Sequence, residues 1–468
     1  MFMTSSSPLP HSIGVVQLPF LHHMTLSVPA TEMGRTLILV SFICVLACNI
    51  YGDSTEATRK LSSIQYNPGC ENDPICKRVS DSGSAPNLLY AYSVGNDTLH
   101  YFFSTVGAPT FLVAKTPGKK QESLNVSWTD FLSVNDTNVK NSVKLPNVNY
   151  AFAVVFTKLY EYNDTNDHAD FTSIPNDEWN WNIRDFAKQF VWKGLNTTEL
   201  NNPVTVRTNL SMTNIDESYI SFDWKLFGNH DRNTEVPHLE HTINDTQFNF
   251  LINNWPTFCE KSRFGLELVM MGTDGVKHMT NIEESKSLDD EYTPGVFTMI
   301  DWSTQSKVLA SDTDESKQLG GYLQWKPVVY LTEERSSQKQ TQAKHYDTMK
   351  ADHSVIKSMV PMRSLAMAFF GDQLNTMTLN ATNISFGLPE DGFYAKSNYT
   401  VWSGSIGYGT PPQDEISILV IIVIAVGLGI PVVLIIFGGL IVCIKRRRSG
   451  KGENILVNVA GTRYDAIN

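Results

Sequence analysis

The side chains in this sequence that could carry chemistry form two small groups. The first is His238 and His241, which bracket Leu239-Glu240 in a polar segment. Two imidazoles at this spacing can belong to a metal site, but a zinc site needs three or four ligands and no neighbouring residue completes the set. We therefore predict no metal at these histidines.

The second group is the acidic cluster Asp289, Asp290 and Glu291. Adjacent carboxylates can supply a general acid or bind calcium, and they are the best catalytic candidates if the chain is a membrane-anchored hydrolase. A solvated turn leading into a strand at 296–300 explains them more simply, and we prefer that interpretation. The sequence has no Gly-x-Ser-x-Gly, His-Glu-x-x-His or phosphate-loop motif. We predict no catalytic residue and no cofactor.

An apolar run near the C-terminus determines where these residues lie relative to a membrane. Residues 416–444 contain no charged residue and no Asn, Gln or His. A helix of this length spans about 44 Å, against about 30 Å of bilayer hydrocarbon, so we predict one membrane helix with a kink at Pro431. Lys445 and three arginines follow directly. Because basic residues stay in the cytoplasm, residues 445–468 are the cytoplasmic tail and the bulk of the chain is lumenal or extracellular.

Residues 1–52 form a leader. The apolar core 37–51 follows Arg35 and is typical of a secretory signal peptide, with an uncleaved signal anchor as the alternative. The residues upstream lack a basic cluster, and Met33 is a possible true start. The net charge of −11 disfavours nucleic acid as a partner.

Three of the six cysteines lie between the leader and the membrane helix: Cys70, Cys76 and Cys259. Cys70 and Cys76 enclose five residues and are the natural disulfide pair in an oxidising compartment. Closing this loop stabilises the fold by about 2 kcal/mol in the chain-entropy model. Cys259 is left over, either free or bonded to another chain.

Glycosylation signals are dense and confined to the same segment, which the topology independently assigns to the lumen. Each marked Asn should lie on the surface, because a glycan is bulky and hydrated. The ten Asn-x-Ser/Thr sites are Asn96, Asn125, Asn135, Asn163, Asn196, Asn209, Asn244, Asn380, Asn383 and Asn398.

The segment 53–413 is mainly β in pattern. Short runs of β-branched and aromatic residues, such as 150–160, alternate with Gly, Asn, Asp and Pro. The pattern predicts a β-sandwich-like ectodomain. Its length predicts two lobes, with a boundary at the polar segment 227–245. Apolar spacing predicts one helix at 178–190, whereas 366–370 is predicted as a strand.

The cytoplasmic tail ends in Tyr464-Asp465-Ala466-Ile467. A Tyr-x-x-apolar tetrapeptide binds in extended form, with Tyr464 and Ile467 in two pockets of a clathrin adaptor. We predict an endolysosomal sorting signal. The alternative is a disordered tail whose tyrosine is merely solvated.

Several stretches together make the chain resemble the glycosylated lysosomal membrane protein family. The resemblance runs from about residue 88 to the C-terminus, including the region 402–412, the membrane helix and the Tyr464 signal, and it does not reach residues 1–52. The other matching stretches are 98–101 (TLHY), 124–128 (LNVSW), 153–157 (AVVFT), 264–268 (FGLEL), 288–294 (LDDEYTP), 324–330 (QWKPVVY) and 368–371 (AFFG).

The resemblance implies a non-catalytic role in the lysosomal membrane. Family members are accessory subunits that associate with a lysosomal major-facilitator transporter of dipeptides and protect it from lumenal proteases. We therefore expect a single-pass type I protein with that transporter as its partner. A membrane-anchored lumenal hydrolase and a cell-surface adhesion receptor are the alternatives.

Overall fold

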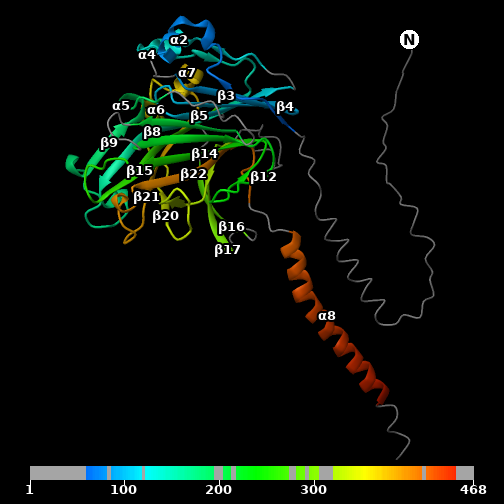
Figure 1. Cartoon of the computed structure of the whole chain (residues 1–468). Helices are drawn as coiled ribbons and strands as arrows, with labels where there is room; N and C mark the ends of the chain where they lie inside the picture. Colours follow the sequence, from blue (N-terminus) through cyan, green and yellow to red (C-terminus); the bar gives the residue numbers. More distant parts are fainter. Residues whose placement is uncertain are drawn as a thin grey trace, which may run out of the picture. The chain divides into compact units, whose positions relative to one another are not determined.

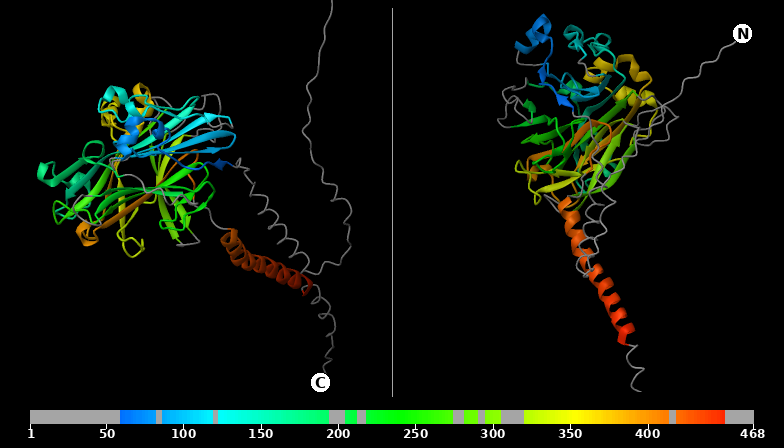
Figure 2. Two further views of the ribbon diagram at one scale, coloured as in Figure 1. Left: turned by 45° about the horizontal axis from the view of Figure 1, so that its top comes forward. Right: turned by 90° about the vertical axis from the view of Figure 1, so that its right-hand side faces the viewer.

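The computed structural model describes residues 59–81, 86–118, 122–193, 204–211, 218–273, 281–289, 295–304, 320–413 and 418–449. The chain from Ala57 onward forms one compact unit. Among the described residues, 18 of its strands form one antiparallel sheet that folds into two layers (Figures 1 and 2), and two short hairpins lie outside that sheet.

The first layer has the strand order β3-β4-β5-β8-β15-β21-β20, with β1 and β2 paired to β3, and β9 paired to β8. Long runs of Val, Phe, Ala and Tyr make its central strands, which are buried on both faces. The strands are β1 Lys60–Leu61, β2 Gln65–Tyr66, β3 Leu88–Val94, β4 Asp97–Ser104, β5 Thr110–Pro117, β8 Tyr150–Asn163, β9 Trp181–Asp185, β15 Ser262–Gly272, β20 Gln340–His345 and β21 Thr378–Phe386.

The second layer has the order β10-β11-β14-β22-β18-β17-β16, and β19 pairs with β22 beside β18. Strand β20 pairs with both β19 and β21 and so joins the layers. The strands are β10 Val204–Ser211, β11 Tyr219–Leu226, β14 Asp245–Asn253, β16 Asn281–Asp289, β17 Gly295–Ser303, β18 Gly321–Trp325, β19 Val328–Tyr330 and β22 Tyr399–Tyr408.

Aromatic side chains fill the space between the layers. The ring centre of Phe248 in β14 lies 5.2 Å from that of Phe111 in β5 and 5.6 Å from that of Phe156 in β8. Trp402 of β22 packs on Phe248 at 5.3 Å. All four side chains are buried, and one continuous core joins both layers. The ectodomain is therefore a single sandwich, as its β pattern predicts.

The predicted division into two lobes is wrong at segment 227–245. This segment connects β11 and β14, which pair directly with each other. It is polar because it covers a polar sheet face. The Asn233 amide donates to Gln247 Oε1 at 2.8 Å, and Gln247 Nε2 donates to the carbonyl of Leu239 at 3.1 Å. The segment carries the short hairpin β12 Asp231–Arg232 and β13 Glu240–His241.

A helical cap packs on the outer side of the first layer (Figure 1). The predicted disulfide between Cys70 and Cys76 is confirmed, and it ties the first two elements of the cap together. The cap consists of η1 Cys70–Asn72, α2 Pro74–Asp81, α3 Trp128–Phe131, α4 Asp136–Val139, α6 His353–Met359, α7 Leu365–Phe370 and η5 Gly371–Asn375, with the hairpin β6 Asn125–Val126 and β7 Val143–Lys144.

Two local predictions are wrong. Residues 178–190 are not one helix but η3 Glu178–Asn180, β9 and α5 Phe186–Gln189. Pairing with β8 extends the backbone of β9, and Asp185 then caps a new turn by accepting from the amide of Ala187. Residues 366–370 belong to helix α7 because Ser364 Oγ accepts from the amide of Met367, a standard N-cap.

The predicted membrane helix is present as α8 Ile418–Ser449. Pro431 lies inside α8 without interrupting it. The segment Val426–Arg447 is long and apolar enough to cross a bilayer. Two further short helices, η2 Phe171–Ser173 and η6 Tyr394–Lys396, lie in loops of the sandwich.

Candidate functional site

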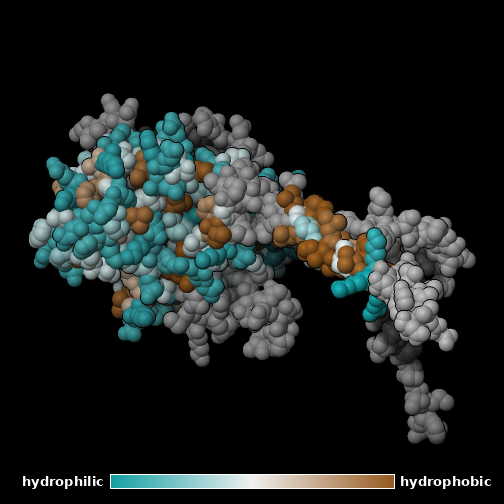
Figure 3. Space-filling view, turned by 90° about the horizontal axis from the view of Figure 1, so that it is seen from below, coloured by the Kyte–Doolittle hydropathy of each residue, from teal (hydrophilic) through white to brown (hydrophobic). Residues whose placement is uncertain are grey.

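The described side chains of α8 up to Ile444 are apolar on all sides, and the helix ends in basic residues. Leu428 and Ile435 are 69% and 73% exposed, and other Val, Leu and Ile residues along the helix are also exposed. Figure 3 shows the contrast between this helix and the mostly hydrophilic surface of the sandwich. A helix that is hydrophobic all round requires a lipid or protein environment.

The chain leaves the sandwich along a fixed path before α8. The amide of Tyr408 donates to the carbonyl of Asn244 at 3.0 Å, and the amide of Gly409 donates to that of Gly320 at 2.8 Å. Gln324 Nε2 donates to the carbonyl of Pro412 at 2.8 Å. Residues 414–417 then link Gln413 to α8, and five residue steps span at most about 18 Å. The sandwich therefore stays within a short chain distance of α8.

A buried carboxyl group lies beside this exit. Asp245 Oδ2 accepts from the amide and the hydroxyl of Thr242 at 2.9 and 2.8 Å. Tyr322 donates to the same oxygen at 3.2 Å. Burial raises the pKa of Asp245 to about 7, against these hydrogen bonds, which favour the charged form. In an acidic compartment this carboxyl group is therefore protonated.

His100 in β4 is a second buried titratable group. Its Nδ1 lies 2.8 Å from the hydroxyl of Tyr90, and its Nε2 lies 2.9 Å from that of Thr116. Burial lowers the pKa of His100 to about 4. The ring therefore stays neutral in all but the most acidic conditions and acts as a structural hydrogen-bonding group.

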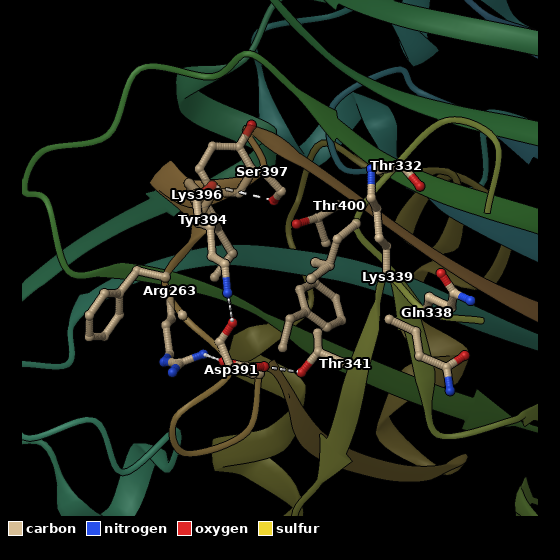
Figure 4. Close-up of a pocket in the computed structure, with 17 residues that line it drawn as sticks. Arg263, Thr332, Gln338, Lys339, Thr341, Asp391, Tyr394, Lys396, Ser397 and Thr400 are labelled. Carbon is tan, nitrogen blue, oxygen red and sulfur yellow. Dashed lines mark hydrogen bonds and ion pairs between the residues drawn. The ribbon is translucent and has the colours of Figure 1, made fainter. Parts of the chain in front are cut away.

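Arg263 in β15 connects three carboxylates at the wall of a cavity of about 470 Å³ (Figure 4). Its nitrogens lie 2.8 Å from Asp164, 2.6 Å from Asp167 and 2.8 Å from Asp391. Lys396, on the opposite side of Asp391, donates to that residue's carbonyl at 3.0 Å. The charge of Arg263 is thus fully engaged, which makes it a structural hub rather than a free ligand-binding cation.

The histidines in the polar segment have structural partners. His238 Nδ1 lies 2.9 Å from the carbonyl of Asn233, and His241 Nδ1 lies 2.9 Å from that of Asn229. His241 also stacks on Phe227 with 3.7 Å between ring centres. Among the described residues, no group of three or more His, Cys, Asp or Glu is placed to hold a metal ion.

One residue of the acidic cluster lies within the described part of the chain. Asp289 ends β16, whereas Asp290 and Glu291 lie outside the described residues, as do Tyr464 and Ile467 of the tail. Cys259 is a free, partly buried cysteine, and its Sγ lies 3.3 Å from Ser262 Oγ.

The glycosylation signals are distributed over several parts of the ectodomain. Asn96, Asn125, Asn135 and Asn398 are exposed, and Asn163, Asn244 and Asn383 are partly exposed. Asn380 is only 7% exposed, so the expectation that every marked Asn lies on the surface is wrong there. The reason is its place in β21, where it pairs with the buried Met270 of β15. Asn209 lies on β10, and Asn196 lies outside the described residues.

Asp245, His100 and Arg263 were not singled out by sequence patterns. Each is one polar residue within or next to an apolar strand, and the partners of Arg263 are far from it in sequence. One sequence feature could have drawn attention to Asp245, which is its position inside the Asn244-Asp245-Thr246 glycosylation site.

Comparison with known proteins places this molecule in a family. A family model described as "Glycosylated lysosomal membrane protein" matches residues 87–449. Glycosylated lysosomal membrane protein A of Xenopus laevis is 34% identical over 427 residues, which cover 89% of this chain and 97% of the relative. The Danio rerio protein of this family is 29% identical, covering 92% of this chain and all of the relative. The Homo sapiens protein is 27% identical, covering 80% of this chain and 87% of the relative.

The names of these relatives describe a membrane protein and give no enzymatic activity. The architecture agrees with them, because a β-rich N-terminal bulk precedes a single apolar helix near the C-terminus among the described residues. The chain belongs to the glycosylated lysosomal membrane protein family, and it is a lysosomal membrane protein of single-pass type I topology.

Proposed function

We propose that this protein is a non-catalytic subunit that stabilises a multi-span transporter in the lysosomal membrane. The partner is a major-facilitator transporter of dipeptides, as the family resemblance implies, and the subunit shields its lumenal loops from proteases. A clathrin adaptor that binds Tyr464 and Ile467 delivers the protein to the lysosome.

The observation that carries this proposal is the short connection between the sandwich and α8. Gln324 holds Pro412, and the link 414–417 is short. A folded body tethered within about 18 Å of its membrane helix can cover the lumenal loops of a neighbouring membrane protein. A body on a long flexible stalk would spend little time there.

Two further features support the proposal. The ectodomain is a compact sandwich with a single core, and compact domains expose few segments to proteases. Its surface also carries many glycosylation signals, and glycans hinder protease access by their bulk. Such a body survives in the lysosomal lumen and can protect a less resistant partner.

The test is the lifetime of the transporter in cells that lack this protein. We expect the transporter to disappear faster from lysosomes after protein synthesis is blocked, and an inhibitor of lysosomal proteases to restore its lifetime. Re-expression of the full chain should also restore it. An unchanged transporter lifetime in the deficient cells would rule out the proposed role.

A further inference from the structure

The cavity of about 470 Å³ shown in Figure 4 is lined by strands of both layers. Phe264 of β15 and Phe386 of β21 line it from the first layer, and Thr400 of β22 lines it from the second. Two loops complete its walls, residues 331–339 before β20 and residues 387–398 before β22. Small-molecule sites have volumes of about 300–1,000 Å³, so the cavity has room for a small organic ligand.

Part of the lining of the cavity is aromatic. Phe264, Phe386 and Tyr394 are buried at its wall, and the ring of Phe264 packs edge-on against that of Tyr394 with 4.8 Å between the ring centres. The hydroxyl of Tyr394 donates to the carbonyl of Asn398 at 2.9 Å and accepts from the amide of Trp255 at 3.0 Å. Both contacts hold the ring of Tyr394 in one position, so it presents a fixed apolar surface to a ligand.

Two threonine hydroxyls that line the cavity have no hydrogen-bond partner among the described residues. The hydroxyl oxygen of Thr332 is buried and unpaired. Thr400 is 4% exposed, and its hydroxyl also makes no hydrogen bond within the described part of the chain. Figure 4 shows the Thr400 oxygen on the side that faces Tyr394. Because a buried hydroxyl without a partner is unfavourable, a ligand with hydroxyl groups of its own would be stabilised at these positions.

The charges around the cavity compensate one another. Arg263 is paired with the three carboxylates described above. Lys339 and Lys396 also line the cavity. These three positive side chains are thus balanced by three negative ones, so the cavity has no excess charge with which to select an anion or a cation. Its unpaired hydroxyls and its ring surfaces favour a neutral ligand that is rich in hydroxyl groups.

A glycosylation signal lies at the wall of the same cavity. It consists of Asn398, Tyr399 and Thr400, and its asparagine is exposed. The amide of Asn398 donates to the carbonyl of Tyr394 at 2.8 Å, and the hydroxyl of Tyr394 donates back to the carbonyl of Asn398. Ser397 and Thr400, on either side of this asparagine in the sequence, both line the cavity. A glycan attached to Asn398 therefore begins next to the cavity.

We propose that this cavity binds a neutral sugar unit of an N-linked glycan. The C–H face of a pyranose ring packs on the aromatic lining, and its hydroxyl groups exchange hydrogen bonds with Thr332 and Thr400. Two sources offer this chemistry, which are the glycan attached to Asn398 of the same chain and a glycan of a neighbouring molecule. The inference goes beyond the proposed function and does not depend on it, because no transporter takes part in the binding.

The test uses the full-length protein in detergent and two probes, N,N′-diacetylchitobiose and a mannose trisaccharide, which represent the sugars in the core of an N-linked glycan. Asn398→Gly removes the attached glycan and fits the positive φ of 51° at this position. In that background, Thr332→Val and Thr400→Val each remove one hydroxyl, and Thr400→Ser restores it. Thr234→Val is the matched control, because it changes an exposed threonine that lines a different cavity, beside the hairpin β12–β13.

The measurement is the affinity for each probe by titration calorimetry. We expect Asn398→Gly to bind at least one probe. Thr332→Val and Thr400→Val should each weaken that binding by about tenfold, equivalent to about 1.4 kcal/mol, whereas Thr400→Ser should restore it and Thr234→Val should not change it.

Wild type identifies the source of the sugar. If its affinity is much lower than that of Asn398→Gly, the glycan of the same chain occupies the cavity. If the two affinities are equal, the cavity takes a glycan of another molecule. The proposal is wrong if Asn398→Gly binds neither probe, or if both valine variants bind as tightly as Thr234→Val.

Discussion

The phenol of Tyr322 in β18 donates a hydrogen bond to the carboxyl group of Asp245 at the start of β14, with 3.2 Å between the two oxygens. Thr242 provides two more donors to the same oxygen. Glu240, on the neighbouring hairpin, adds negative charge, and burial raises the pKa of Asp245 to about 7. This carboxyl group is therefore protonated to a greater extent at the pH of the lysosome than at the higher pH of the secretory pathway.

Asp245→Asn should remove part of the pH dependence of stability. Between the unfolded value of 3.8 and about 7, the folded protein binds more protons than the unfolded chain, so the free energy of unfolding falls as pH rises. A shift of about three units corresponds to about 4 kcal/mol over that window. The amide is neutral throughout and keeps the glycosylation signal at Asn244 and Thr246. The unfolding temperature of the variant should fall less than that of wild type as the pH rises from about 5 to about 7.

The contribution of His100 to the pH dependence of stability must be separated from that of Asp245, because the two have opposite signs. The pKa of His100 is lowered from 6.5 to about 4, so its contribution to stability is present above the unfolded value and is lost as pH falls toward 4. The substitution at position 245 leaves His100 unchanged. Its contribution therefore cancels when the two pH profiles are subtracted. Parallel profiles for wild type and Asp245→Asn would contradict the role of Asp245.

Arg263→Met should be strongly destabilising. Arg263 is buried, and its loss leaves Asp164, Asp167 and Asp391 close together without their shared cation. Breaking a buried ion pair from one side costs about 3–5 kcal/mol. Arg263→Lys should recover only part of this, because a single ammonium group cannot reproduce three separate contacts. The stability of both variants is measured as the free energy of unfolding in denaturant. If Arg263→Met is as stable as wild type, the three ion pairs of Arg263 do not stabilise the fold.

The sequence predicts the sandwich better than its details, for physical reasons. Dense β-branched and aromatic runs such as β8 predict strands because their burial does not depend on which neighbour covers them. Strand β9 and helix α7 were missed because a pairing partner and a single capping serine decide their conformation. Arg263 and Asp391 could not be connected from sequence, since they are 128 residues apart and only the folded sheets bring them together.

Replacing both Cys70 and Cys76 by Ala should weaken the helical cap and leave the sandwich folded. The disulfide closes a short loop between η1 and α2, worth about 2 kcal/mol in the chain-entropy model. Neither cysteine lies on a strand of the two layers. We expect faster proteolysis near α2, read by mass spectrometry of the fragments, with circular dichroism of the β-sheet unchanged. Loss of the β-sheet signal would show that the cap is required for the sandwich to fold.

Asn380 should carry no glycan in the mature protein, in contrast to Asn96. Asn380 is 7% exposed and its β21 backbone pairs with β15, whereas Asn96 is exposed in the turn between β3 and β4. A glycan on Asn380 would have to displace packed side chains. Asn96→Gln should therefore increase gel mobility by one glycan, and Asn380→Gln should not change it. Glycopeptide mass spectrometry checks both positions, and an occupied Asn380 would contradict this prediction.

Tyr464→Ala should move the protein from lysosomes to the cell surface. The proposed adaptor binds the ring of Tyr464 in one pocket and the side chain of Ile467 in another, so losing either group removes half of the recognition. Ile467→Leu is the matched control, because it keeps a bulky apolar side chain. Surface biotinylation should show a several-fold rise for Tyr464→Ala and little change for Ile467→Leu. If the subunit accompanies its transporter, the transporter should appear at the surface in the same cells. An unchanged surface fraction for Tyr464→Ala would show that the tail motif does not direct sorting.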